Sequence, residues 1–142
     1  MYYTTSKGEE VPIIMQLSET FEGSDGRSIG VNNGDWLEGP GTNCYALALG
    51  LVGRIKSYND FIKIAQDKGY DVVDGEARAG DIWVSNNGDH VMEIISIENG
   101  ITTYRSTNTG HDTMTGTFDE INDEQMGFSP LTQEGSRIIR KK

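Results

Sequence analysis

Two side chains in this 142-residue sequence have the chemistry of a nucleophile and its base: the single cysteine, Cys44, and the histidine His90. Cys44 follows the turn-forming segment Gly39–Asn43 and begins a nearly all-apolar run, 44–51. This pattern predicts a short buried helix with the sulfur in its first turn. Backbone N–H groups and the helix dipole lower a thiol pKa there and can stabilise an oxyanion. A lone cysteine is more often a small buried hydrophobe, but the position of Cys44 favours a nucleophile.

His90 follows the turn Asn86–Asp89 and begins a predicted strand, which places its imidazole at a sheet edge near the mouth of a cleft. An imidazole titrates near neutral pH and can accept a thiol proton. The alternative is an exposed turn histidine without a role. The other histidine, His111, lies in loop composition and is expected at the surface.

The predicted hairpin around Asn99-Gly100 suggests a third member of the site. With a two-residue turn, Thr109 would lie opposite His90. With a three-residue loop that includes Glu98, Asn108 would lie opposite His90 instead. We prefer the second register, because it pairs Glu93 with Arg105, and opposite charges across a strand pair are stabilising. Asn108 would then fix the tautomer of the imidazole.

The remaining pattern predicts an α+β fold in which a helical part precedes an antiparallel sheet. Thr42 or Asn43 caps the first helix and Gly53 follows it, and a second helix begins at Ser57 and stops at Gly69. Strands are predicted at 11–15, 82–84, 90–97 and 101–107, and more weakly near 117–118 and 138–139. We expect a single domain, 1–142, comprising an N-terminal strand and cleft loop (1–43), helices (44–69) and an antiparallel sheet (80–142).

Composition limits the classes of partner. The net charge of −10 argues against binding to nucleic acid or to a membrane surface. One cysteine excludes an intramolecular disulfide and a four-cysteine zinc site. No apolar run is long enough to span a bilayer, and the N-terminus has no signal-peptide pattern. We therefore expect a cytoplasmic protein, or a bacterial domain exported by dedicated machinery or within a larger chain.

Three segments, taken in order, resemble the NlpC/CHAP superfamily of papain-like cysteine peptidases and amidases. They are the cysteine segment Thr42–Ala48, the Gly-Asp-apolar segment Arg78–Val84 and the His-Val segment Gly88–Met92, and the resemblance covers roughly residues 39–110. It implies an antiparallel sheet packed on the cysteine helix, thiolate–imidazolium chemistry, an acyl-enzyme and no cofactor. The family's third polar residue maps onto Asn108, or less readily onto Ser106. Family members commonly cut stem peptides of bacterial peptidoglycan.

Several residues depart from the family pattern or extend it. Glu93 stands where the family strand is usually apolar. Before the cysteine, Asp35 and Glu38 replace the paired aspartates of a calcium loop, so we predict no metal. Candidates for the substrate cleft or the oxyanion hole are Asn43, Trp36 and Ser106, with Asn33 as a further oxyanion candidate, whereas Trp83 is expected in the core.

Three functional hypotheses follow. The first is a cysteine peptidase or amidase whose substrate is a peptide or a peptidoglycan fragment. The second keeps the thiol chemistry but assigns it to a delivered bacterial toxin domain that proteolyses or deamidates a protein, with a cognate inhibitor or immunity protein. The third is a binding module that has the fold without the activity.

Overall fold

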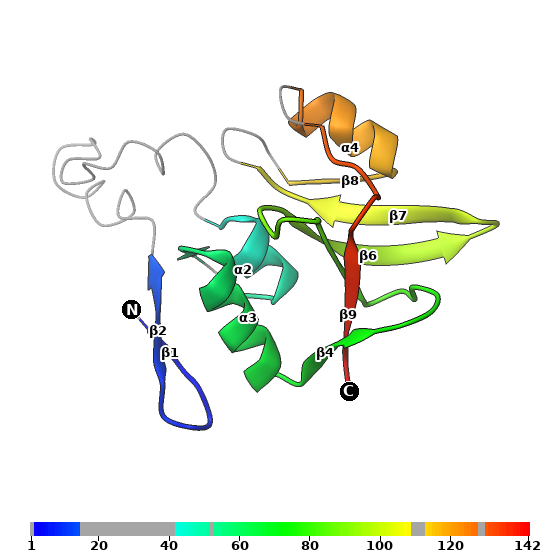
Figure 1. The fold of residues 1–142 in the computed structure, drawn as a ribbon. Helices are drawn as coiled ribbons and strands as arrows, with labels where there is room; N and C mark the ends of the chain where they lie inside the picture. The colour runs from blue at the N-terminus through cyan, green and yellow to red at the C-terminus, as the bar shows by residue number, and fades with distance from the viewer. Residues whose placement is uncertain (1, 15–41, 52, 109–112, 128–129) are drawn as a thin grey trace, which may run out of the picture.

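The computed structural model describes residues 2–14, 42–51, 53–108, 113–127 and 130–142 (Figure 1). Its strands form a three-stranded sheet in the order β1-β2-β3 and a six-stranded sheet in the order β4-β9-β5-β6-β7-β8. The strand pairs are antiparallel, as expected for the α+β class. The elements in chain order are β1 (Tyr2–Thr4), β2 (Glu10–Ile14), α2 (Cys44–Ala48), β3 (Arg54–Ile55), α3 (Tyr58–Asp67), β4 (Tyr70–Val73), β5 (Ile82–Val84), β6 (Val91–Glu98), β7 (Ile101–Ser106), β8 (Met114–Gly116), α4 (Phe118–Gln125) and β9 (Arg137–Lys141).

Apolar residues cover both faces of the large sheet. Side chains alternate along β5, so Ile82 and Val84 pack in one core with α2 and α3, whereas Trp83 packs in a second core. Met92 of β6 and Ile121 of α4 belong to the second core. Figure 1 shows the corresponding arrangement, with α4 lying over β7 and β8 and away from α2 and α3. The expectation that Trp83 is a core residue is confirmed.

The two predicted helices form where their capping residues indicate. Asn43 is the N-cap of α2, and Ser57 is the N-cap of α3. The α2 helix ends at Ala48, earlier than the apolar run suggests, because the chain turns at Gly50 with a positive φ of 73°. The Leu51 N–H then donates to the Ala46 carbonyl, which satisfies one of the last carbonyls of the helix.

The predicted sheet region 80–142 also contains a helix, which corrects the expectation of a strand near 117–118. Thr117 accepts a hydrogen bond from the Glu120 backbone N–H, and the Glu120 side chain accepts from the Thr117 backbone N–H. This capping box starts α4. The strand expected near 138–139 is confirmed as β9, which lies between β4 and β5.

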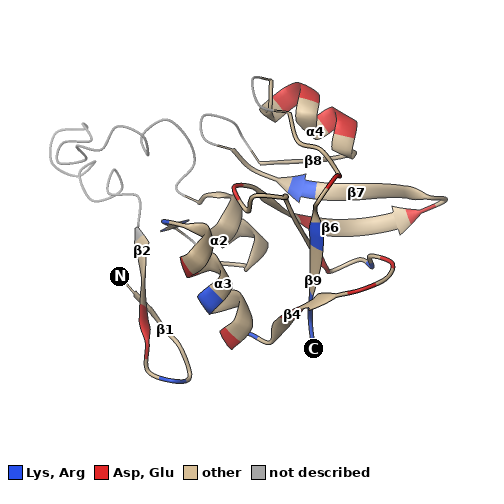
Figure 2. Cartoon of the chain, viewed as in Figure 1, with Lys and Arg blue, Asp and Glu red and all other residues tan. Residues whose placement is uncertain are grey.

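Acidic residues gather on α4 (Figure 2). Its outward positions are exposed, while Ile121 and Gln125, four residues apart, are buried against the sheet. The exposed acidic residues are Asp119, Glu120, Asp123 and Glu124. Within the described part of the chain, no helix combines the length and apolar character needed to cross a lipid bilayer.

The hairpin of β6 and β7 combines the two registers considered from the sequence. Asn99 and Gly100 both have positive φ values, 52° and 78°, as a two-residue type I′ turn requires. Next to this turn Glu98 pairs with Ile101, whereas farther along Glu93 pairs with Arg105. A bulge at Ile95 inserts one extra residue and changes the register between these pairs. The predicted Glu93–Arg105 pair is confirmed, and the predicted three-residue loop is wrong.

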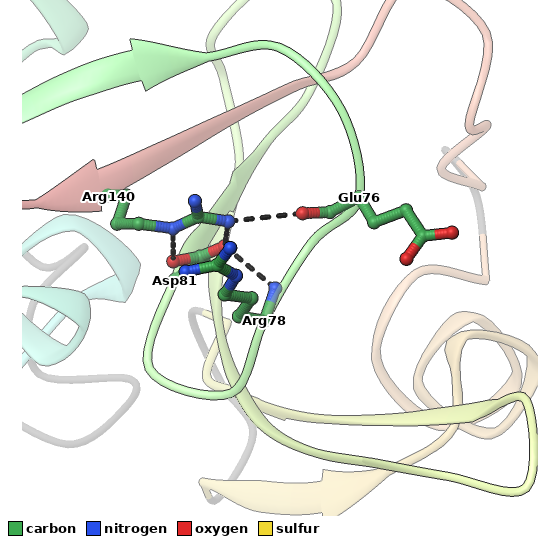
Figure 3. A network of polar contacts seen from close by, with 4 residues as sticks. All are labelled: Glu76, Arg78, Asp81 and Arg140. Carbon is green, nitrogen blue, oxygen red and sulfur yellow. Dashed lines mark hydrogen bonds and ion pairs between the residues drawn. The ribbon is translucent and has the colours of Figure 1, made fainter.

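The Gly-Asp-apolar segment has a structural role at its aspartate (Figure 3). The Arg140 guanidinium donates to both carboxylate oxygens of Asp81, each at 2.8 Å, and the Arg78 backbone N–H donates to the same carboxylate at 2.8 Å. Arg140 also donates to the Glu76 carbonyl at 3.1 Å. Burial by itself raises the pKa of the Asp81 carboxyl, but its bonds with Arg140 and Arg78 outweigh that effect, and the pKa is lowered. This network joins β9 to the segment that begins β5.

We predict that Asp81→Asn lowers the melting temperature at pH 7 by roughly 5 °C, because it removes charge-assisted bonds at a buried position. The pKa of Asp81 in the folded protein lies below the unfolded value of about 3.9. The stabilisation is therefore complete above about pH 4 and is lost as pH falls through the folded-state pKa. Thermal melts from pH 7 to pH 2 should decline less steeply below pH 4 for Asp81→Asn than for the wild type.

A matched control is Asp71→Asn, since Asp71 pairs with Lys142 at an exposed position of the same sheet. Exposed ion pairs contribute little, so its melting temperature should stay within about 1–2 °C of the wild type. If the melting temperature of Asp81→Asn fell below pH 4 as steeply as that of the wild type, the Asp81 carboxylate would not be the source of this pH-dependent stability.

Candidate functional site

Cys44 is the first residue of α2, as predicted, and its position depends on Asn43. The Asn43 Oδ1 accepts from the backbone N–H groups of Ala46 and Ile55, each at 3.2 Å, and its Nδ2 donates to the Ile55 carbonyl at 2.9 Å. Both ends of this amide are thus used to join the start of α2 to β3. Asn43, considered from the sequence as an oxyanion donor, is placed here as a positioning residue for the cysteine.

The Cys44 sulfur lies against the start of β6. The backbone N–H groups of Val91, of Tyr45 and of Cys44 itself act on it. These donors lower the thiol pKa, but burial has the larger effect and raises the pKa to about 11, with a smaller contribution from the charge of Asp89. The expectation that the helix start lowers the pKa below its usual value is therefore wrong. Cys44 nevertheless keeps part of its surface exposed.

His90 is buried, with 4% of its surface exposed, rather than open at a sheet edge. Burial lowers its pKa to about 4, although the charge of Asp89 opposes this shift. Val91, whose N–H acts on the sulfur, is the next residue, so the backbone beside His90 lies near the thiol. The imidazole itself is directed to Ser106. Between the described side chains of Cys44 and His90, no hydrogen bond is formed. At pH 7 the thiol and the imidazole are therefore both uncharged.

The polar partner of the imidazole is Ser106, the residue given less weight from the sequence. The His90 Nε2 lies 2.9 Å from the Ser106 Oγ, and both residues are buried. Asn108, the preferred candidate, has its Nδ2 directed to the Gln125 carbonyl at 2.9 Å and the Met126 sulfur at 3.5 Å. The structure therefore places Ser106 on the ring and Asn108 on the end of α4.

A third polar residue, Gln125 of α4, completes this cluster and was not identified from the sequence. The Ser106 hydroxyl donates to the Gln125 Oε1 at 2.8 Å, and the Gln125 Nε2 donates to the Ser106 carbonyl at 3.2 Å. The capping pattern Thr117–Glu120 gives the start of α4, and from it the helical period places Gln125 on the same face as Ile121. That reasoning would have identified a buried glutamine.

The turn before His90 is anchored to the helices. The Tyr45 hydroxyl donates to the Gly88 carbonyl at 2.6 Å, and the His90 backbone N–H donates to the Ser85 hydroxyl at 3.1 Å. Gly88 has a φ of 79° and packs so closely on the Tyr58 ring that a Cβ atom would lie 2.7 Å from it. Because Tyr45 follows the cysteine directly, one helix turn holds the sulfur and fixes the histidine turn.

Other residues considered from the sequence are not among those that the structure describes. Trp36, Asn33, Asp35 and Glu38 are outside the described residues, as is His111. Among the residues that the structure describes, no three His, Cys, Asp or Glu side chains are grouped to hold a metal ion. Two surface pockets lie away from the cysteine, one between the β1–β2 turn and α3 and one along β4 and β9.

We predict that alkylation of Cys44 by iodoacetamide in the folded protein is slow at pH 7 and accelerates about tenfold per pH unit up to pH 10. The reason is that only the thiolate reacts, and the thiol pKa is about 11. In urea the same thiol should titrate near its ordinary value of about 8.5 and react about 100-fold faster at pH 7. Mass spectrometry follows the single cysteine without ambiguity. A rate that is already constant below pH 7 would show a preformed thiolate and contradict this description.

Comparison with protein-family models, with curated proteins and with solved structures found no match to this chain. The geometry of the site and the motif resemblance of the sequence are therefore the two grounds for interpreting its chemistry. Of these, the geometry supplies a half-buried thiol near the backbone of Val91, a buried neutral imidazole on the preceding residue and a polar cluster around that imidazole.

Proposed function

We propose that this protein is a cysteine-dependent amide hydrolase with a papain-like arrangement, in which Cys44 is the nucleophile and His90 its base. The observation that supports the proposal is that the backbone N–H of Val91, the residue after buried His90, acts on the Cys44 sulfur at the start of α2. Ser106 occupies the Nε2 side of that ring. In the mechanism we propose, the Nδ1 side of the ring serves the thiol.

The uncharged resting state implies a general-base mechanism. As the sulfur attacks the carbonyl carbon of an amide, its proton passes to the His90 Nδ1, and a tetrahedral oxyanion forms. The imidazolium then protonates the leaving amine, which departs and leaves a thioester on Cys44. Water, deprotonated by His90, attacks the thioester and releases the acid and the thiol. We assign the oxyanion to backbone N–H groups at the start of α2, where those of Cys44 and Tyr45 act on the sulfur.

The substrate we propose is the stem peptide of bacterial peptidoglycan, and this assignment follows from the motif resemblance. The negative net charge disfavours long-range attraction to anionic wall polymers, so recognition would depend on local shape. A peptide or protein substrate would use the same thiol chemistry. The test below separates these two substrate classes.

A non-catalytic module with the same fold is the second candidate, and a specific observation favours it. The thiol pKa is about 11 and the imidazole pKa about 4, so a proton remains on sulfur in the resting protein. A binding module needs neither group to ionise. The two candidates differ in whether Cys44 is required for a chemical change in the ligand.

We predict that the purified protein converts solubilised peptidoglycan fragments to shorter peptides detectable by mass spectrometry, and that Cys44→Ala abolishes the conversion. His90→Gln should slow it by at least about 100-fold, because the base is lost. The matched control is His111→Gln, which changes the other histidine and should keep wild-type activity. Melting curves of each variant verify that the fold is retained.

Three outcomes are distinguishable. Cleavage that requires Cys44 supports the proposal. In the second outcome the wall fragments stay intact, but proteins in a mixture of unfolded and folded proteins are cleaved or deamidated in a Cys44-dependent way. This outcome supports the mechanism and overturns the substrate class. The absence of any change in either substrate overturns the proposal in favour of the binding module.

A further inference from the structure

The buried cluster behind His90 determines which imidazole nitrogen carries the proton. Its members are His90, the residue before β6, Ser106 on β7 and Gln125 on α4, with exposed fractions of 4%, 0% and 4%. Because these side chains are almost closed to solvent, hydrogen bonds within the protein set the directions of their bonds. The orientation of the Gln125 amide fixes the direction of its bond with Ser106, and this bond in turn fixes the direction of the bond between Ser106 and His90.

The amide of Gln125 has one possible orientation. Its Nε2 lies 3.2 Å from the Ser106 carbonyl, which only accepts, so the nitrogen end of the amide must face that carbonyl. The Oε1 end then faces the Ser106 hydroxyl at 2.8 Å. An amide oxygen has no proton to give, so the Ser106 hydroxyl is the donor in this bond. With its single proton used, the Ser106 Oγ can only accept from His90 at 2.9 Å.

We propose that Gln125 is a positioning residue that, through Ser106, holds neutral His90 in the tautomer protonated at Nε2 and unprotonated at Nδ1. As a consequence, Nδ1 has a lone pair, as the base of the proposed mechanism requires. Without Gln125 the serine hydroxyl rotates, donates to Nε2 as readily as it accepts, and both tautomers become populated. This inference deepens the proposed function and rests on it for its catalytic meaning, whereas the tautomer itself is independent of any substrate.

The test is the ¹⁵N spectrum of the imidazole in the uniformly labelled full chain, recorded with His111→Gln as background so that a single histidine remains. In the wild-type cluster at pH 7.5 we expect a non-protonated nitrogen at Nδ1 and a protonated one at Nε2. Gln125→Leu should bring both resonances toward intermediate values. Gln125→Glu should keep the wild-type pattern, because a carboxyl oxygen still accepts from Ser106. The exposed Gln66→Leu on α3 is the matched control and should change nothing.

This pair of variants separates a positioning role from a merely structural one. Both variants replace the amide, so a merely structural role would affect them alike. If Gln125→Leu does not fold, Ser106→Ala provides the same test, because it removes the acceptor of the Nε2 proton and should likewise mix the tautomers. A wild-type ring protonated at Nδ1, or unchanged tautomers in the folded Gln125→Leu or Ser106→Ala protein, overturns the inference.

Kinetics distinguish failure of the inference from failure of the proposed function. Where hydrolysis is detected, Gln125→Leu should lower kcat by about 10-fold with little change in KM, and Gln125→Glu should recover most of it. A wild-type protein with the expected tautomer but without hydrolysis would overturn the proposed function and leave the role of Gln125 in ring orientation intact. Hydrolysis combined with a ring protonated at Nδ1 would overturn the role of Gln125 and leave the proposed function intact.

Discussion

The arrangement of the site depends on one extra residue in β6. The type I′ turn at Asn99-Gly100, continued without a bulge, would pair Glu93 with Ser106 and turn the serine toward the face of the sheet that carries Glu93. The bulge at Ile95 shifts the pairing by one residue, so Arg105 faces Glu93 instead. Ser106 then lies on the same face as His90 and diagonal to it, within hydrogen-bonding reach. Since side chains alternate along a strand, a one-residue shift decides which face receives each of them.

The bulge also explains why the polar cluster is shielded on the α4 side of the sheet. His90 and Ser106 point to the face that α4 covers, where Gln125 completes their hydrogen bonds. The sulfur of Cys44 approaches from α2, at the end of the sheet where it contacts the Val91 backbone. Nucleophile and base therefore belong to different packing layers that meet at the start of β6. Burial of both groups keeps them neutral, which is the electrostatic consequence of placing them inside the fold.

Local signals in the sequence predicted a helix capped by Thr42 or Asn43 and a helix that begins at Ser57. They also predicted the core position of Trp83 and the Glu93–Arg105 pair. Each depends on interactions within a few residues or across one hairpin. The α4 helix was missed although its Thr117–Glu120 capping box is readable, because the two-residue pattern Thr117-Phe118 was interpreted as a strand. The sequence carried no comparable signal for the Ile95 bulge. Each of the two hairpin registers was considered for the whole hairpin, so a hairpin that changes register partway along was not predicted. The pKa shifts of Cys44 and His90 depend on burial by distant segments, which no local pattern encodes.

The position of β9 between β4 and β5 has a consequence for how the molecule is made. Strands β4 and β5 are consecutive in the sequence, yet they are joined in the sheet only through β9. During translation the sheet cannot close until residues 137–141 have left the ribosome. Until then the edge of β5 that faces away from β6 has no partner strand in its own sheet. This unpaired edge is a target for chaperones and for association with other nascent chains. The Arg140–Asp81 contact forms in the same late step, so closure of the sheet and burial of the aspartate happen together.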